Sequence, residues 1–273
     1  MKNQLICEHW CETVVAGIVV ETTLDTGKQV QLPHMFGISY SPWTYKSRWA
    51  LANRGLAYRY SEYTPMISKW MMRMRLRCWS ESLTVPLMMT EQETLFSSWD
   101  IGVFAEQHGT GNPLQMADPR VQHWNRLSDR ILELGRIRIS LSIRHEPNAL
   151  KAALPSGLRW IPGGRMIARQ GVNYMLKTYP VDVAEDQLIE QTATLLAEVR
   201  AGLAGKPYLL EQPSYADLAV ASCLQMVRPV AAGIIPLNSD LHSVWAESTL
   251  SASFDDLCHW RDETMRELNA PLL

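Results

Sequence analysis

The stretch SYSPWTYKSRWALANRG, residues 39–55, joins an apolar run of β character to a helix. Ser41 suits the position of a helix cap, Pro42 suits the first helical position, and Gly55 ends the helical pattern. The sequence therefore places a hydroxyl group at the positive end of a helix, where unpaired backbone N–H groups and the helix dipole favour an anion. Because an ordinary helix cap gives the same pattern, the neighbouring stretches must decide what Ser41 does.

Length and composition set the broad class of the protein. The chain has 273 residues and a mass of 31.0 kDa, enough for two domains of ordinary size. Its formal net charge of -2 and pI of about 6.4 show neither a basic footprint nor a polyacidic tail, so we expect no nucleic-acid partner. The five cysteines are odd in number and scattered, which fits a reducing cytosol better than a secreted disulfide framework.

The early apolar run VVAGIVV, residues 14–20, is too short to span a membrane. The polar residues Glu8, His9 and Glu12 before it are atypical of a signal peptide. We therefore expect a cytoplasmic protein with no membrane partner.

Residues 1–30 are expected to form an N-terminal arm. Cys7, His9 and Cys11 follow one another closely, but structural zinc sites normally use four ligands with wider spacing, so we expect no metal site. The segment Asp-Thr-Gly-Lys, residues 25–28, separates two β-type runs and is compatible with a hairpin.

From residue 32 the pattern alternates between strands and helices. We expect strands at 32–39, 56–63, 84–89 and 94–96, and helices that begin at Ser41, at Thr64 and within 97–101. The methionine-rich part of the second helix is typical of adaptable core packing. Pro86 must lie at a strand start, at an edge or after a cis peptide bond, because a central strand does not tolerate proline. The order β-α-β-α-β-β-α indicates a thioredoxin-like α/β domain, which we place at residues 31–109.

The remaining chain, residues 117–273, is predicted to be an all-helical domain. Apolar residues recur at steps of three and four along 119–143, and a second regular helix is expected at 183–203. Ser214 and Asp217 form an S-x-x-D capping box ahead of a run of small and apolar residues, which is typical of a buried central helix.

Taken in order, these motifs resemble those of the glutathione S-transferase family, in particular serine-type, bacterial-like cytosolic members. The resemblance covers about residues 32–269. It is carried by Ser41-Pro42-Trp43 with residues 48–55, by residues 84–86 and 97–101, and by KPYLL and PSYADLAVAS in the second half. It implies an α/β N-terminal thioredoxin-like domain (βαβαββα) followed by an all-α C-terminal domain.

The resemblance also implies a chemistry, in which glutathione is the co-substrate and no metal is used. The thiolate attacks a small hydrophobic electrophile bound against the helical domain, usually in a homodimeric detoxification enzyme. The pKa of the thiol must then fall from about 8.5 to about 7 or lower, since thiolate is the nucleophile. A fall of two units corresponds to about 2.7 kcal/mol. A hydroxyl hydrogen bond to a charged acceptor contributes about 1.5–3 kcal/mol and a helix N-terminus about 0.3–1 kcal/mol, so a serine there needs no general base.

Register against the family's first helix places Ser41 at the position of the activating residue. Because Ser41 is not cysteine, we do not expect mixed-disulfide chemistry. Tyr40 is the alternative hydroxyl, since tyrosine-type members use a tyrosine at the end of the first strand, and Ser39 is a third.

The resemblance assigns four residues to glutathione. Val85 stands before the family's cis-proline, here Pro86, and its main chain pairs with the cysteinyl part. Ser98 and the N–H groups of its helix receive the γ-glutamyl carboxylate, although Ser98 is equally explained as a helix cap. Ser97 stands where the family usually has an acidic or amide residue facing the glutamyl amine, and Asp100 is the nearest substitute.

For the electrophile pocket the resemblance implicates the first helix and the first long helix of the second domain. The candidates are Trp43, His123, Trp124 and Arg126. Trp124 also lies on the apolar stripe of its helix and is equally explained as a core residue.

Two alternatives stay open, and the first of them is motivated by the altered glutamyl end and the N-terminal arm. One is a non-catalytic binding or structural module with the transferase scaffold. The other is a glutathione-dependent isomerase or dehalogenase on that scaffold.

Overall fold

The computed structural model describes residues 31–63, 73, 84–154, 159–160, 162–230 and 234–271. Several predictions from the sequence lie outside these residues. They are the arm at 1–30 with its hairpin and its Cys7, His9 and Cys11, and, apart from Arg73, the methionine-rich helix that begins at Thr64.

Four strands form one mixed sheet in the order β2-β1-β3-β4. The strands are β1 (His34–Gly37), β2 (Arg59–Glu62), β3 (Leu87–Met89) and β4 (Thr94–Leu95). Strands β1 and β2 run parallel, with Gly37 opposite Glu62. Strand β3 runs antiparallel to β1, with Leu87 opposite Phe36, and β4 runs antiparallel to β3. This is the sheet predicted for a thioredoxin-like half.

The position of Pro86 explains how a proline is tolerated next to the central strand β3. The Val85–Pro86 peptide bond is cis, and Pro86 directly precedes the first residue of β3. The proline is therefore outside the hydrogen-bonded ladder, where its missing N–H has no cost. The sequence allowed three placements for Pro86, at a strand start, at an edge or after a cis bond, and the structure shows the first and the third.

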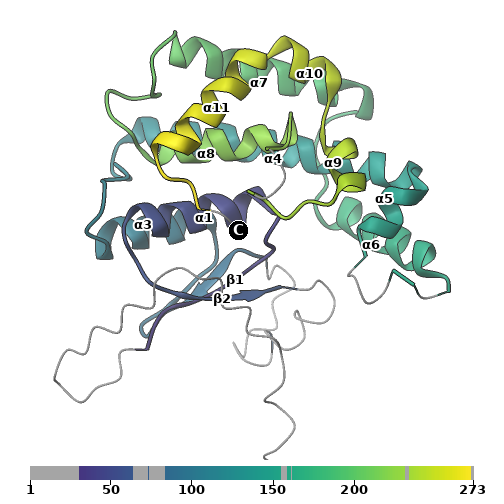
Figure 1. Cartoon of the computed structure of the whole chain (residues 1–273), viewed down its shortest axis with the longest axis horizontal. Coiled ribbons are helices and arrows are strands. Elements are labelled where there is room, and N and C mark those ends of the chain that lie inside the picture. The colour runs from purple at the N-terminus through teal and green to yellow at the C-terminus, as the bar shows by residue number, and fades with distance from the viewer. Residues whose placement is uncertain are drawn as a thin grey trace, which may run out of the picture.

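Helix α1 (Pro42–Asn53) lies beside α3 (Ser98–His108) on one face of the sheet (Figure 1). Nine of the twelve residues of α1 are buried, because the sheet covers one side of the helix and the helical half covers the other. Helix α1 is thus an internal layer of the molecule, and its first turn lies at the boundary of the two halves.

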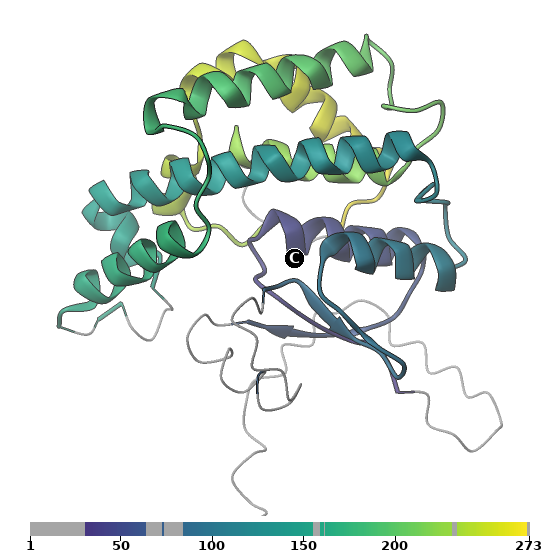
Figure 2. The same ribbon diagram turned by 180° about the vertical axis from the view of Figure 1, so that it is seen from behind.

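The second half consists of helices stacked on α1 and α3. They are α4 (Pro119–His145), α5 (Pro147–Ala152), α6 (Gly164–Thr178), α7 (Leu188–Leu203), α8 (Tyr215–Cys223), α9 (Ser239–Trp245), α10 (Ser248–Ser253) and α11 (Asp255–Glu267), with 3-10 turns at Glu185–Gln187 and Leu224–Met226. Both views show α4 and α8 next to α1 and α3, with α7, α10 and α11 beyond them (Figure 2). No helix within the described ranges is long and apolar enough to cross a membrane.

One helix begins later than predicted. The sequence suggested a start at Val183, but α7 begins at Leu188 after the 3-10 turn Glu185–Gln187. The backbone of Ala184 is extended, and neither Ala184 nor Gln187 makes a side-chain capping bond. A regular helix from Val183 would leave its first backbone N–H groups without a side-chain acceptor, so no regular helix begins there.

The predicted capping box of the central helix α8 is present. Ser214 Oγ accepts the N–H of Ala216 at 3.2 Å, and Asp217 Oδ2 accepts the N–H of Ser214 at 2.9 Å. Every residue of α8 is buried, and burial raises the pKa of the Asp217 carboxyl to about 6, against the opposing effect of its hydrogen bonds. The box therefore begins a helix that packs on α1, α4 and α11.

A single core joins the two halves. The buried ring of Tyr215, at the start of α8, donates its hydroxyl to Ser98 O at 2.9 Å. Trp49 of α1 donates Nε1–H to Leu268 O at 3.0 Å. Most buried apolar residues of α1, α3, α4 and α8 belong to one cluster, so the halves share stabilising contacts. Leu134 and Ile137 of α4 belong to a smaller, separate cluster.

Candidate functional site

The strand register brings three predicted segments to one end of the sheet. The turn at 39–41 follows the end of β1, Val85 and Pro86 precede the start of antiparallel β3, and Ser97 follows the end of β4. Since β1, β3 and β4 are neighbours, the outer two are about 10 Å apart. An extended peptide of three residues spans about 10 Å as well, so a tripeptide can reach from the Ser41 turn to the start of α3.

Ser41 lies at the N-cap position of α1, as the sequence predicted. Its backbone is extended, its N–H donates to Ile38 O at 2.9 Å, and its side chain makes no capping bond to the helix. The side chain that stabilises this turn belongs to Thr44, because Thr44 Oγ1 accepts the N–H of Ile38 at 3.1 Å. A Cβ atom at Gly37 would lie 2.5 Å from Thr44 Cγ2, so this close turn requires glycine. The Ser41 hydroxyl is therefore not used by the helix that it precedes.

Tyr40, the alternative hydroxyl, belongs to the boundary between the halves. Its ring meets the ring of Trp245, on α9, nearly edge-on, with centroids 6.2 Å apart. Desolvation raises the pKa of Tyr40, and the nearby negative charge of Glu62 raises it further. Tyr40 consequently keeps its proton at neutral pH and is a hydrogen-bond donor.

Ser39, the third candidate, is already bonded to an acidic residue that the sequence reasoning missed. Glu62, the last residue of β2, accepts the Ser39 N–H at 3.0 Å and the Ser39 hydroxyl at 3.3 Å. The same carboxylate accepts the hydroxyl of Tyr60 at 2.9 Å. Glu62 could have been predicted from its position in the chain. It is the last residue of β2, and two parallel neighbouring strands end at the same edge of the sheet, here beside the turn after β1.

At the start of α3 the helix cap is Ser97 and not Ser98. Ser97 Oγ accepts the N–H of Asp100 at 3.0 Å and donates to Asp100 Oδ2 at 2.7 Å. Ser98 is the first helical residue and is buried, and its carbonyl accepts the hydroxyl of Tyr215. The interpretation of Ser98 as a cap is therefore wrong by one residue. The Asp100 carboxylate lies at the helix start, beside Ser97.

The four candidates for the electrophile pocket are not brought together. Trp43 faces α4 and donates Nε1–H to Asp129 Oδ1 at 2.9 Å. His123 faces α7, where its Nε2 lies 3.0 Å from Glu198 Oε1, and Trp124 packs against Gly202 of α7. Arg126 is exposed. The reason is that α4 is covered on more than one side, and residues 123 and 124 occupy the side that faces α7.

The side of α4 that faces α1 carries a polar network that the sequence did not reveal. The completely buried Lys46 donates to Asn125 Oδ1 at 2.8 Å and lies 2.7 Å from Asp129 Oδ1. Asn125 Nδ2 in turn donates to Asp129 Oδ2 at 3.0 Å. The i, i+4 pair Asn125 and Asp129 on an amphipathic helix was the available signal. Together with Trp43, this network fixes the first turns of α1 against α4.

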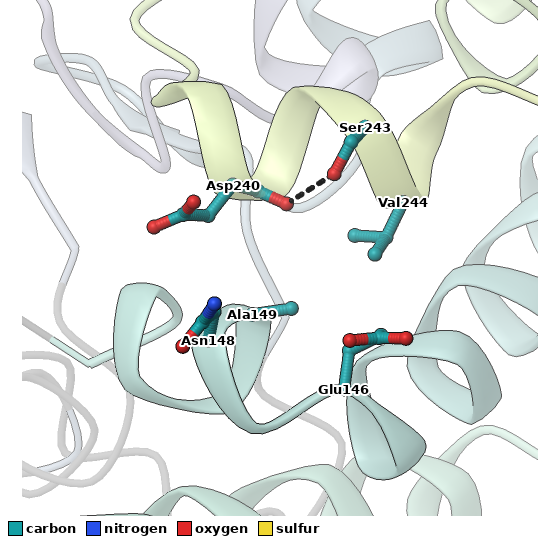
Figure 3. Close-up of a pocket in the computed structure, with 6 residues that line it drawn as sticks. All are labelled: Glu146, Asn148, Ala149, Asp240, Ser243 and Val244. Atoms are coloured by element: carbon teal, nitrogen blue, oxygen red, sulfur yellow. Dashed lines mark hydrogen bonds between the residues drawn. The ribbon is translucent and has the colours of Figure 1, made fainter.

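A pocket of about 370 Å³ lies between α5 and α9 (Figure 3). It is lined by Glu146, Asn148, Ala149, Asp240, Ser243 and Val244. The carboxylates of Glu146 and Asp240 come from opposite walls, and Ser243 Oγ donates to Asp240 O at 2.9 Å. None of the predicted site residues lines this pocket.

Comparison with known proteins shows the fold. No family model and no curated protein matches the sequence. A glutathione S-transferase from Methylobacterium radiotolerans, solved in complex with glutathione sulfonate, matches with a TM-score of 0.52 and 15% identity, over 88% of this chain and 95% of that one. The beta-etherase LigF from Sphingobium sp. strain SYK-6 matches with a TM-score of 0.54 and 15% identity, over 87% and 98%. The glutathione transferase GSTFuA3 from Phanerochaete chrysosporium matches with a TM-score of 0.53 and 16% identity, over 89% and 98%. The chain therefore has the fold of the glutathione S-transferases.

Proposed function

We propose that the protein is a glutathione transferase that conjugates the glutathione thiolate to small hydrophobic electrophiles. The observation that carries the proposal is the meeting of the Ser41 turn, the Val85–Pro86 bond and the start of α3 at one sheet end, within reach of one extended tripeptide. Solved structures of this fold include one with glutathione sulfonate and one with GSH bound.

In the proposed complex the three segments hold different parts of glutathione. The main chain of Val85 pairs with the cysteinyl part. The γ-glutamyl carboxylate lies at the start of α3, where Ser98 and free N–H groups receive a negative charge. Asp100, bonded to Ser97 at 2.7 Å, supplies the acidic group for the glutamyl amine that position 97 lacks.

Ser41 is the proposed activating residue because its hydroxyl is not engaged as a cap of α1. Its hydrogen bond and the helix start together stabilise the thiolate by about 2–4 kcal/mol, enough for the required fall in thiol pKa. The thiol proton passes to solvent, the sulfur forms a bond to the electrophilic carbon, and the leaving group departs with its electron pair. Tyr40 remains the second candidate for the donor, since its raised pKa keeps it protonated.

Two measurements test the proposal. We expect the full-length protein to be retained on immobilised glutathione, to be eluted by free glutathione, and to turn over 1-chloro-2,4-dinitrobenzene. Absence of both retention and turnover would favour the binding or structural module. Retention with glutathione-dependent halide release from a haloalkane, but no aryl conjugation, would favour the dehalogenase. We further propose that the enzyme is cytoplasmic and acts as a homodimer. Sedimentation of the purified protein tests the homodimer, and cell fractionation tests the location.

A further inference from the structure

Arg136, on α4, lies beside the first turn of α1. Its guanidinium carbon is 5.0 Å from the ring centroid of Trp43, which follows Ser41 by two residues. It is also 4.3 Å from the ring centroid of Tyr179, which ends α6. Two aromatic rings and one cation from three helical segments therefore meet at the first turn of α1, which Ser41 precedes.

The guanidinium of Arg136 has no acceptor among the residues that the structure describes. Its Nε is buried without a hydrogen-bond partner, and no ion pair is formed. The carboxylate of Glu133, one turn earlier, is paired with Arg130 at 3.2 Å. A buried N–H without an acceptor costs free energy, so a ligand that brings an acceptor to the guanidinium is favoured.

The next arginine on the helix shows the contrast. Arg138 donates to Met226 O at 2.7 Å and to Trp245 O at 2.6 Å, so it has a clear structural role. Arg136, two residues earlier, has aromatic neighbours but no such acceptors. Arg136 therefore contacts its neighbours through cation–π interactions, which leave its N–H groups available to an acceptor from a ligand.

Aromatic residues also surround the guanidinium more widely. Tyr63, which follows β2, lies close enough to Tyr179 and Tyr174 for their charges to help burial raise the pKa of Tyr63 to about 12. The surface near Arg136 thus offers aromatic rings together with the cation of Arg136, and Arg73 adds positive charge near Tyr63. A planar molecule with one anionic group matches both features, since the guanidinium fork pairs with a carboxylate through two parallel hydrogen bonds.

We infer that the electrophile of this enzyme is an aromatic carboxylate, with its carboxylate on Arg136 and its ring against Trp43 and Tyr179. The inference rests on the proposed function, and it names the substrate class for the same site. For a chloronitrobenzoate, the glutathione sulfur bonds to the ring carbon that carries chlorine, and chloride leaves with the electron pair of the C–Cl bond. Arg136 binds the far end of the ring and takes no part in bond exchange.

The test uses a matched pair of probes, 4-chloro-3,5-dinitrobenzoate and the neutral 4-chloro-3,5-dinitrobenzamide. After division by the uncatalysed rate with glutathione, we expect kcat/KM of the wild-type enzyme to favour the benzoate by about tenfold or more. Arg136→Gln should abolish the preference, and Arg136→Lys should keep part of it, because lysine retains the charge without the planar fork. The matched control Arg169→Gln removes the same charge from an exposed site on α6 and should keep the full preference.

A second measurement separates this inference from the proposed function. Calorimetry with unreactive 4-nitrobenzoate and 4-nitrobenzamide reports binding without glutathione or turnover. If no probe is conjugated, the proposed function fails while the calorimetry still decides the role of Arg136. Equal binding of both probes by the wild-type protein overturns the inference, and this comparison needs no variant to fold. An undiminished preference in a folded Arg136→Gln protein overturns it as well.

Discussion

Lys46 Nζ lies 2.7 Å from Asp129 Oδ1, and the lysine side chain has no exposed surface. The pair joins α1 of the sheet-containing half to α4 of the helical half. Trp43 and Asn125 donate to the same carboxylate, so Asp129 is the centre of the network. A buried ammonium group depends on its counter-charge, because each ion loses several kcal/mol of hydration in the interior.

We predict that Asp129→Ala lowers the free energy of unfolding by about 3–5 kcal/mol, since it leaves a buried lysine without its carboxylate. Lys46→Met should cost less. The Asp129 side chain is 32% exposed and keeps two other donors. Urea denaturation of both variants measures the difference, and equal costs would contradict it.

The Ser41 assignment predicts the behaviour of the bound thiol. Ser41→Ala should lower kcat by about 10- to 100-fold, because the thiolate loses a charge-assisted hydrogen bond. Affinity for glutathione should change little, and the pKa of its bound thiol should rise, as read from thiolate absorbance against pH. If Tyr40→Phe removes activity and Ser41→Ala does not, Tyr40 is the activating residue.

The capping box predicts a pH dependence of stability. Burial raises the pKa of Asp217 from its usual 3.8 to about 6, so the folded protein binds this proton more tightly than the unfolded chain does. Its stabilising contribution is complete below about pH 4 and is lost as pH rises through about 6, by about 3 kcal/mol. In Asp217→Asn the fall of unfolding free energy between these pH values should be smaller. Asp186→Asn, at an exposed site, should retain the wild-type slope.

A fourth prediction concerns the contact between α8 and α3. Tyr215→Phe removes the hydroxyl that bonds to Ser98 O at 2.9 Å and leaves that buried carbonyl unsatisfied. The expected loss of stability is about 1–2 kcal/mol. Tyr208→Phe is the matched control, because the Tyr208 hydroxyl bonds to Glu267 at the surface. Its expected effect is below about 0.5 kcal/mol. Thermal unfolding of the two variants compares them, and equal losses would argue against a role for the buried bond.

The features that were predictable from the sequence have local causes. Pro86 could not continue a central strand, and Ser214 with Asp217 had the spacing of a capping box. Both were confirmed, because each depends on a few adjacent residues. The order of the strands and helices was predictable for the same reason, because each follows from the periodicity of a short stretch.

The features that were missed depend on partners far away in the sequence. Periodicity showed that α4 has an apolar face, but it did not show which neighbouring helix covers each side. His123 and Trp124 were therefore expected near Trp43, whereas the structure places them against α7. The burial of Lys46 follows from Asn125 and Asp129, about 80 residues later. At α3, Ser97 and Ser98 are both suitable caps, and only the geometry distinguishes them.

The bond from Trp49 to Leu268 spans 219 positions of the chain. The ribosome adds Trp49 long before Leu268, so the Trp49 indole has no acceptor until residue 268 has been translated. Helix α1 is almost fully enclosed in the folded molecule, so the nascent sheet-containing half exposes the side of α1 that the later helices cover. The burial of α1 is therefore complete only after residue 268 has been translated.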